Sequence, residues 1–479
     1  MDSLTEFVDQ TERKNFAYVD YAHRFTTELY NPKQWTELFS KSGAQYIVMV
    51  SKHHEGYCNF NSKNISTTWN WNSMDVGPKR DLVGELVSAI RGTGSSGDDG
   101  TTTTSSSPVK SKQTNQPLKF GIYHSAFEWY NPLFLQDKAN NFTTQDFVNL
   151  KTLQELYYLV NTYEPEIIWS DGDWMAPDNY WKSKEFLAWL ATNSTVKDTV
   201  VWNDRWGKDV KCNHGSFLTC KDRYEPSTTL KQKWEKCLSM DKTSWGYNRN
   251  STLSMYLTIS EIIHNVISSI SKNGNILLNI GPNSDGTISP IFEDRLLQLG
   301  NWLSINGEAV YNTTPWNVCS NDTITTTDDD GDNGDNTDST PKVYYTRSKN
   351  KLYVHITQWP KGNYINLTCP EITSSSKAYM LGLDETNDDG VEEEDRRGGG
   401  GGVDLLNKIS SDEDKVTTTD VRLRLPALTP ADIPCQHAWV IVLTDIANLD
   451  EHDGVNDFLE KEETKLEGST QSSLLRQKE

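Results

Sequence analysis

Four short apolar runs in this chain each end in a cluster of polar and aromatic residues, and this repeated pattern constrains the fold most. The runs cover residues 46–50, 120–122, 165–168 and 199–202. Apolar runs of this length are typical of buried strands. Where parallel strands form a barrel, the carboxyl ends of the strands carry the chemistry. We therefore expect an α/β protein whose functional residues directly follow these strands.

The cluster after the third run gives the strongest signal for catalysis. It reads Trp169-Ser170-Asp171-Gly172-Asp173-Trp174 and places the carboxylate of Asp171 between two tryptophans. A flat aromatic ring suits the C–H groups of a sugar, and a carboxylate can meet the anomeric carbon. An Asp at a strand end could instead cap the following helix. The clusters after the other runs favour a sugar site.

Histidine, tyrosine and arginine side chains follow the other three runs. They stand in Lys52-His53-His54-Glu55-Gly56, Tyr123-His124-Ser125 and Asn203-Asp204-Arg205-Trp206-Gly207. Adjacent histidines can bind a metal, but neither an HExxH motif nor a third ligand at helical spacing accompanies this pair. Hydrogen bonding to sugar hydroxyls is the more economical role. We therefore expect neither a metal nor a cofactor.

These blocks resemble those of the α-L-fucosidases of glycoside hydrolase family 29, above all its eukaryotic lysosomal branch. The resemblance runs from about residue 16 to 316 and takes in further blocks: Trp69-Asn70-Trp71-Asn72, residues 75–82, residues 123–129, Leu278-Asn279-Ile280-Gly281-Pro282 and residues 302–308. It implies a (β/α)8-like barrel over residues 1–315, followed by an antiparallel β-sandwich over residues 316–446. The implied activity is retaining, exo-acting hydrolysis of terminal α-L-fucose from glycoproteins, glycolipids and oligosaccharides.

Retaining glycosidases use one carboxyl group as the nucleophile and a second as acid and then base. The resemblance implies that Asp171 is the nucleophile, and it leaves Asp222 and Glu235 as alternatives for the acid/base. Apolar neighbours would raise the pKa of Glu235, whereas the loop of Asp222 could reach over the sugar, which favours Asp222 slightly. The sugar pocket implied by the resemblance consists of His53, His54, Tyr123 or His124, Trp169 and Arg205.

The net charge of −21 lies mostly in three acidic segments. Low-complexity stretches predict disordered insertions at about residues 92–116, 321–341 and 384–403, and residues 447–479 predict an acidic tail. Since the sequence has no basic stripe, a nucleic-acid partner is disfavoured. No run of 18 apolar residues predicts a membrane span. The expected partners are fucosylated glycans, and homo-oligomerisation is left open.

Cysteines and glycosylation sequons favour a lysosomal or secreted protein. The chain has seven cysteines, of which Cys212 and Cys220 share a short loop and predict a disulfide. Asn-x-Ser/Thr sequons begin at Asn64, Asn141, Asn193, Asn250, Asn312, Asn321 and Asn366.

The first residues of the chain differ from this expectation. They do not read as a signal peptide, and the His-Trp-Gly and Ser-Glu-Trp motifs of the family's first barrel strand have no counterpart. We therefore expect a chain truncated before its first strand, whose own activity is in doubt. The alternative functions are a catalytically inactive fucosidase-like protein and a fucose-binding protein.

Overall fold

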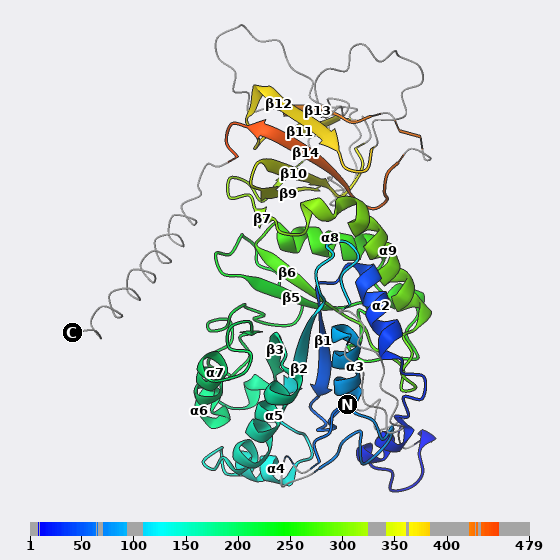
Figure 1. The fold of residues 1–479 in the computed structure, drawn as a ribbon, viewed down its shortest axis with the longest axis vertical. Coiled ribbons are helices and arrows are strands. Elements are labelled where there is room, and N and C mark those ends of the chain that lie inside the picture. The colour runs from blue at the N-terminus through cyan, green and yellow to red at the C-terminus, as the bar shows by residue number, and fades with distance from the viewer. Residues whose placement is uncertain are drawn as a thin grey trace, which may run out of the picture. The chain divides into compact units, whose positions relative to one another are not determined.

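The structure is a computed structural model that describes residues 8, 10–63, 65, 70–92, 109–323, 342–360, 364–383, 421–426, 428–429 and 433–449. The chain divides into two compact units (Figure 1). The first comprises Met1–Glu225, Gln232–Ile262 and Asn275–Ser304. The second comprises Pro226–Lys231, Ile263–Gly274 and Ile305–Glu479. Each unit has a buried hydrophobic cluster of its own.

A four-stranded parallel sheet forms the centre of the first unit. Its strands follow the order β1-β2-β3-β4 and are Tyr46–Lys52 (β1), Lys119–Ser125 (β2), Ile167–Asp171 (β3) and Val201–Trp202 (β4). The four predicted apolar runs are therefore strands, and every pair is parallel. The register aligns Ser125 with Asp171, so the polar clusters meet at one edge of the sheet. Ligands of open parallel sheets bind outside this edge.

Two further strands, Trp234–Ser239 (β5) and Gly274–Asn279 (β6), pair with each other. The side chain of Tyr46, at the start of β1, reaches both: its hydroxyl donates to Glu235 Oε2 at 2.5 Å and lies 3.4 Å from the Ile276 carbonyl oxygen. Within the described residues of the first unit, backbone pairing groups the strands into these two sheets. The parallel α/β architecture is confirmed, and closure into a (β/α)8-like barrel stays a prediction.

Helices cover the parallel sheet. Those of the first unit are Pro32–Ser42 (α2), Leu82–Arg91 (α3), Pro132–Ala139 (α4), Leu153–Tyr163 (α5), Asp178–Trp181 (α6) and Ser183–Thr192 (α7). Helix α3 shows how the sequence sets the ends of a helix. The Asp81 side chain caps the first turn by accepting from the Gly84 amide, and Gly92, at φ 67°, ends the helix. Its apolar positions are buried in the core with residues of β2 and α5. Helices Ile259–Ile270 (α8) and Pro290–Asn306 (α9) have residues in both units.

The second unit is built from antiparallel strands, as predicted for this part of the chain. One sheet has the order β12-β14-β10-β9-β7, with β8 paired to β9, and a second sheet pairs β11 with β13. The strands are Thr314–Pro315 (β7), Asn321–Thr323 (β8), Lys342–Ser348 (β9), Lys351–Ile356 (β10), Tyr364–Leu367 (β11), Ile372–Met380 (β12), Val421–Arg424 (β13) and Trp439–Ile446 (β14). Apolar side chains of both sheets share one buried cluster, which is the packing of a two-layered β domain.

The predicted low-complexity segments lie largely outside the described residues, but their margins correct the prediction. Residues 109–116, expected in a disordered loop, form a bridged turn in which the Ser111 amide donates to the Gln116 carbonyl at 2.8 Å. Residues 321–323 form β8. In the predicted tail, Leu449 is buried, and its carbonyl accepts from Arg347 at 3.2 Å. At the first two margins the predicted disorder was wrong, because the backbone there has hydrogen-bond partners.

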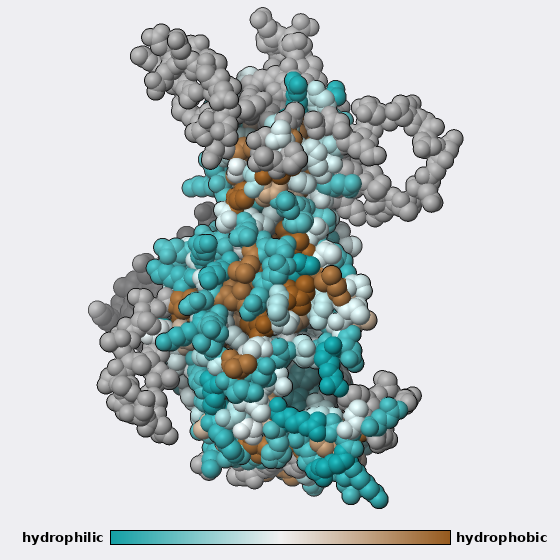
Figure 2. Space-filling view, turned by 90° about the vertical axis from the view of Figure 1, so that its right-hand side faces the viewer, coloured by the Kyte–Doolittle hydropathy of each residue, from teal (hydrophilic) through white to brown (hydrophobic). Residues whose placement is uncertain are grey.

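The face of the molecule in Figure 2 carries mainly hydrophilic side chains, and the apolar ones lie chiefly near the middle of the view. This is the usual composition of a protein surface in water. Among the helices that the structure describes, none combines the length and hydropathy that crossing a membrane requires.

Candidate active site

One guanidinium group joins two of the predicted catalytic carboxylates. Arg205, which follows β4, donates from Nη1 to Asp171 Oδ1 at 2.9 Å and from Nη2 to Asp222 Oδ1 at 2.7 Å. Asp171 is the last residue of β3, so two neighbouring parallel strands bring it and Arg205 together. The planar fork of arginine binds carboxylates with fixed geometry. The fork therefore sets the positions of Asp171 and Asp222 relative to each other.

The loop that carries Asp222 is fastened to the end of β4 by Asp204. The Asp204 carboxylate accepts from the backbone amides of Cys212 at 2.7 Å, Thr219 at 2.8 Å and Cys220 at 3.1 Å. Cys212 and Cys220 form a disulfide, as the sequence predicted. Because the loop is closed on itself and bonded to the strand end, Asp222 is held at the site rather than left on a free loop.

Asp171 is buried among groups that favour its ionised form. The Tyr123 hydroxyl donates to Asp171 Oδ2 at 2.6 Å, and His54 Nε2 lies 3.5 Å from the same oxygen. Burial alone would raise the pKa of Asp171, but the Arg205 charge, the Tyr123 hydrogen bond and His54 outweigh it and lower the pKa. The carboxylate is therefore ionised at neutral pH, as a nucleophile requires.

Aromatic rings form a stacked wall beside these carboxylates. The guanidinium carbon of Arg205 lies 4.5 Å from the centre of the Trp169 ring. Trp169 stacks on Tyr123 with ring centres 5.6 Å apart, and Tyr123 stacks on His53 at 5.8 Å. The structure thus brings five of the predicted pocket residues to Asp171: His53, His54, Tyr123, Trp169 and Arg205.

Glu235 lies behind this wall. Its carboxylate accepts from Trp169 Nε1 at 2.9 Å and from the Tyr46 hydroxyl at 2.5 Å, and the residue is only 3% exposed. Burial raises the pKa of Glu235, although these hydrogen bonds act in the opposite direction. The side chain of Asp222, in contrast, is 51% exposed. The two candidates for the acid/base therefore differ in their access to solvent.

Comparison with known proteins decides the family. The α-L-fucosidase family model matches residues 1–96 and 104–308, and the model of the α-L-fucosidase C-terminal domain matches residues 335–444. The chain is 42% identical over 431 residues to the human tissue α-L-fucosidase, covering 90% of this chain and 78% of that protein. This chain belongs to the α-L-fucosidase family. It is a glycoside hydrolase, and its activity is the release of terminal α-L-fucose, as the sequence predicted.

Two further comparisons agree with this assignment. The tissue α-L-fucosidase of Rattus norvegicus is 40% identical over 444 residues, covering 93% of this chain and 82% of that protein. The crystal structure of the Thermotoga maritima α-fucosidase is similar in fold, with a TM-score of 0.66 and 25% identity over 92% of this chain and 85% of that chain.

His124 does not join Asp171 in this fucosidase. Its Nδ1 lies 2.9 Å from Ser51 Oγ, and its Nε2 lies 3.4 Å from Glu155 Oε2. Burial lowers the pKa of His124 to about 4, so the ring is neutral at pH 7. Tyr123 and His124 are neighbours on β2 and point to opposite faces, and of the two it is Tyr123 that contacts Asp171.

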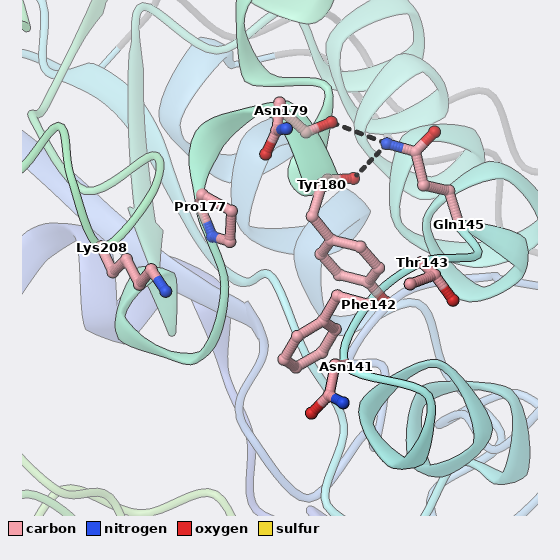
Figure 3. Close-up of a pocket in the computed structure, with 8 residues that line it drawn as sticks. All are labelled: Asn141, Phe142, Thr143, Gln145, Pro177, Asn179, Tyr180 and Lys208. Atoms are coloured by element: carbon pink, nitrogen blue, oxygen red, sulfur yellow. Dashed lines mark hydrogen bonds between the residues drawn. The ribbon is translucent and has the colours of Figure 1, made fainter.

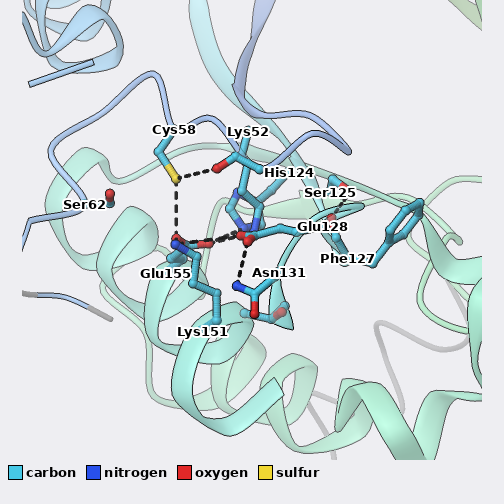
Figure 4. Close-up of polar contacts among 12 residues, drawn as sticks. Lys52, Cys58, Ser62, His124, Ser125, Phe127, Glu128, Asn131, Lys151 and Glu155 are labelled. Atoms are coloured by element: carbon cyan, nitrogen blue, oxygen red, sulfur yellow. Dashed lines mark hydrogen bonds and ion pairs between the residues drawn. The ribbon is translucent and has the colours of Figure 1, made fainter. Parts of the chain in front are cut away.

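Glu155 belongs to a feature that the sequence analysis missed. The buried ion-pair cluster consists of two lysines and two glutamates with fully buried side chains, Lys52, Lys151, Glu128 and Glu155 (Figure 4). Lys52 Nζ lies 2.9 Å from Glu128 Oε1 and 2.7 Å from Glu155 Oε2. Lys52 ends β1 and precedes His53 and His54 directly. A lysine at the end of an apolar run was the signal in the sequence that such a cluster exists.

Asp173, the neighbouring carboxylate in the same motif, makes no hydrogen bond to Arg205. It is fully buried, and neither of its carboxylate oxygens has a hydrogen-bond partner among the described residues. Burial raises its pKa to about 6. The surroundings of Asp173 therefore act in the opposite direction to those of Asp171, which lower the pKa.

A separate hollow of about 510 Å³ lies in the first unit beside α6 (Figure 3). It is lined by Asn141, Phe142, Thr143, Gln145, Pro177, Asn179, Tyr180 and Lys208. Figure 3 shows the Gln145 amide turned toward the backbone of Asn179 and Tyr180, to which it donates at 2.7 and 3.2 Å. None of the residues predicted for the sugar pocket lines this hollow.

Proposed function

We propose that this enzyme retains configuration, with Asp171 as the nucleophile and Asp222 as the acid/base. The observation that carries the proposal is the Arg205 fork, which holds the two carboxyl groups through the two terminal nitrogens of one guanidinium. Retaining glycosidases keep their carboxyl groups about 5–5.5 Å apart, close enough for direct attack on the sugar. A separation spanned by one guanidinium suits that requirement better than the wider gap of inverting enzymes.

In the first step, an Asp171 oxygen forms a bond to the anomeric carbon of fucose while the glycosidic C–O bond breaks. Asp222 gives its proton to the departing oxygen, so the leaving group is released as a neutral alcohol. In the second step, Asp222 takes a proton from water, whose oxygen attacks the anomeric carbon and displaces Asp171. Arg205 contacts both carboxylates throughout and can balance the charge that passes between them.

Asp222 is the better candidate than Glu235 because a glycosidic oxygen must reach the acid. Half of the Asp222 side chain is open to solvent. Both oxygens of Glu235 are already engaged, one by Trp169 and one by Tyr46, in a nearly closed environment. The raised pKa of Glu235 suits an acid, but this carboxyl has no free access to a leaving group. We propose that Glu235 positions the Trp169 ring.

The remaining contacts suit a small deoxy sugar. His53, His54 and Arg205 can donate to hydroxyls, and the Trp169 ring offers an apolar wall to the C6 methyl group. One methyl contact discriminates by only about 1–3 kcal/mol, so the hydroxyl contacts must supply the rest of the specificity. His124 supports this pocket from within the core.

We further propose that the strands of the first unit belong to a (β/α)8-like barrel and that the boundary to the β domain lies near residue 315. Tyr46 links β1 to β5 and β6 and supports such an arrangement. The disulfides Cys212–Cys220 and Cys319–Cys369 fit an oxidising compartment, so the proposed location is lysosomal or extracellular. The proposed partners are fucosylated glycans.

Kinetics of three variants test the assignment. Asp171→Gly should lose turnover of an aryl α-L-fucoside, and added azide should restore part of it by replacing the nucleophile. Asp222→Ala should slow the hydrolysis of a fucosylated glycan far more than that of an activated aryl fucoside, whose leaving group departs without protonation. Glu235→Gln should affect the two substrates alike. A substrate-dependent loss in Glu235→Gln, and none in Asp222→Ala, would reverse the two roles.

A further inference from the structure

Exposed aromatic side chains gather beside the site without a part in the proposed mechanism. We name as the aromatic rim Tyr18, Trp129, Tyr130 and Trp174, which are between 38% and 44% exposed. Tyr18 begins the short helix Tyr18–Arg24 (η1), and Trp174 lies in the turn Asp173–Met175 (η3). Trp129 and Tyr130 follow β2. Three segments far apart in the sequence therefore contribute to one set of exposed rings.

Three rings of the rim contact one another, and Trp174 joins them through the His54 ring. The ring centre of Tyr18 lies 6.4 Å from that of Trp129 and 5.6 Å from that of Tyr130. Trp129 and Tyr130 are 6.3 Å apart. These spacings are those of aromatic pairs in van der Waals contact. Clustered, solvent-exposed aromatic rings of this kind mark interaction sites more often than scattered single ones do.

The rim continues into the sugar pocket through His54. Trp129 and Trp174 lie 5.9 and 5.3 Å from the His54 ring, and the Trp129 amide donates to the His54 carbonyl at 2.7 Å. His54 in turn lies 3.5 Å from the nucleophilic carboxylate of Asp171. The exposed rings therefore begin one side chain away from the bond that the enzyme breaks.

A polar group accompanies the rings. The Glu55 carboxylate lies 3.2 Å from His53 Nδ1 and close enough to Tyr18 and Tyr130 to raise the pKa of both hydroxyls, after burial as the larger cause. Aromatic faces with a nearby carboxylate match the two sides of a pyranose, since the C–H face covers a ring and the hydroxyls donate to the carboxylate.

We propose that the aromatic rim binds the sugar to which the terminal fucose is attached. The inference rests on the proposed function, because the fucose must lie against Asp171 for its neighbour to reach the rim. A substrate cut from its end leaves the pocket on the side of the scissile bond, and the rim is the exposed surface that continues from His54. The preferred substrates are then fucosides whose leaving group is itself a pyranose.

The test compares two substrates that differ only in the leaving group. A fucosyl disaccharide presents a pyranose to the rim, whereas α-L-fucosyl fluoride presents no ring. Trp129→Ala and Tyr130→Ala should each lower kcat/KM for the disaccharide by about 3- to 10-fold more than for the fluoride, the effect of one aromatic contact. Leu135→Ala is the matched control, since Leu135 is 48% exposed on the adjacent helix α4. Leu135→Ala should leave kcat/KM unchanged for both substrates.

A binding measurement separates failure of the rim from failure of the catalytic assignment. Asp171→Asn, titrated with the disaccharide and with fucose, should bind the disaccharide more tightly, and Trp129→Ala added to it should remove this difference. Equal losses on both substrates in both rim variants, or equal affinities for disaccharide and fucose, would overturn the proposal. If the unaltered chain binds the disaccharide more tightly than fucose but hydrolyses neither the disaccharide nor the fluoride, the role of the rim is supported and the proposed mechanism is overturned.

Discussion

Replacing Glu155 with glutamine should destabilise the first unit severely, because it breaks the buried ion-pair cluster. The Glu155 carboxylate contacts Lys52 Nζ at 2.7 Å, Lys151 Nζ at 2.9 Å and His124 Nε2 at 3.4 Å, and all four side chains are at most 1% exposed. Glutamine keeps the size of the side chain and removes its charge. Two buried ammonium groups would then share the single carboxylate of Glu128.

The expected cost follows from the desolvation of these ions. Breaking a buried ion pair by removing one partner costs about 3–5 kcal/mol, because the other charge stays buried without compensation. Glu155 serves two lysines, which places Glu155→Gln at the upper end of this range. An exposed carboxylate on a helix of the same unit provides the control: Glu185→Gln on α7 should change the free energy of unfolding by less than about 0.5 kcal/mol.

The pH dependence gives a second, independent check. Burial would raise the pKa of Glu155, but Lys151 and Lys52 outweigh it and hold the pKa well below its usual value. A lowered pKa means that the stabilisation is present above the pKa of the unfolded state and is lost as the pH falls through the folded value. The difference in the free energy of unfolding between the unaltered chain and Glu155→Gln should therefore be largest at pH 7 and become smaller in acid.

Hydrogen exchange of amides in β1 and α5 measures this unit separately, which matters because a chain of two units need not unfold in one step. A double variant, Lys52→Met with Glu155→Met, removes one charge of each sign and should be less destabilised than Glu155→Gln. The argument from buried charge would be refuted if Glu155→Gln lowered the free energy of unfolding by less than about 1 kcal/mol at pH 7. It would also be refuted if the double variant lost as much stability as its two single substitutions added together.

Three further outcomes are expected. Tyr123→Phe removes the hydroxyl that donates to Asp171, so the pKa of Asp171 should rise and the acidic limb of the pH profile of kcat/KM should move up by about one unit. Cys212→Ser opens the disulfide to Cys220, and a thermal melt should show a loss of roughly 2–3 kcal/mol. Asp173→Asn replaces a buried carboxyl whose pKa is raised to about 6. Ionisation of this buried carboxyl opposes folding above that pH. In denaturant titrations, the free energy of unfolding of the variant should therefore exceed that of the unaltered chain by about 2–3 kcal/mol at pH 8 and by little at pH 4.

Local sequence was enough to predict the strands of the parallel sheet and the residue that we assign as the nucleophile. Apolar runs of three to five residues form strands here through the preferences of neighbouring residues. A functional side chain that directly follows a strand needs no further information to be placed at the sheet edge. Asp171 satisfies both conditions, and the family resemblance of its motif supplied the proposed role.

Tertiary structure decided the contacts between residues distant in the chain. Tyr123 and His124 have the same sequence signal, and only the packing of β2 determines which of them faces Asp171. The sequence left both Glu235 and Asp222 as candidates for the acid/base, with Asp222 slightly favoured. In the structure, Glu235 bonds to Trp169 and Tyr46, whereas Asp222 bonds to Arg205. Strand formation depends on short local apolar runs, whereas a shared guanidinium depends on how several loops close in space. No local pattern in the sequence encodes that closure.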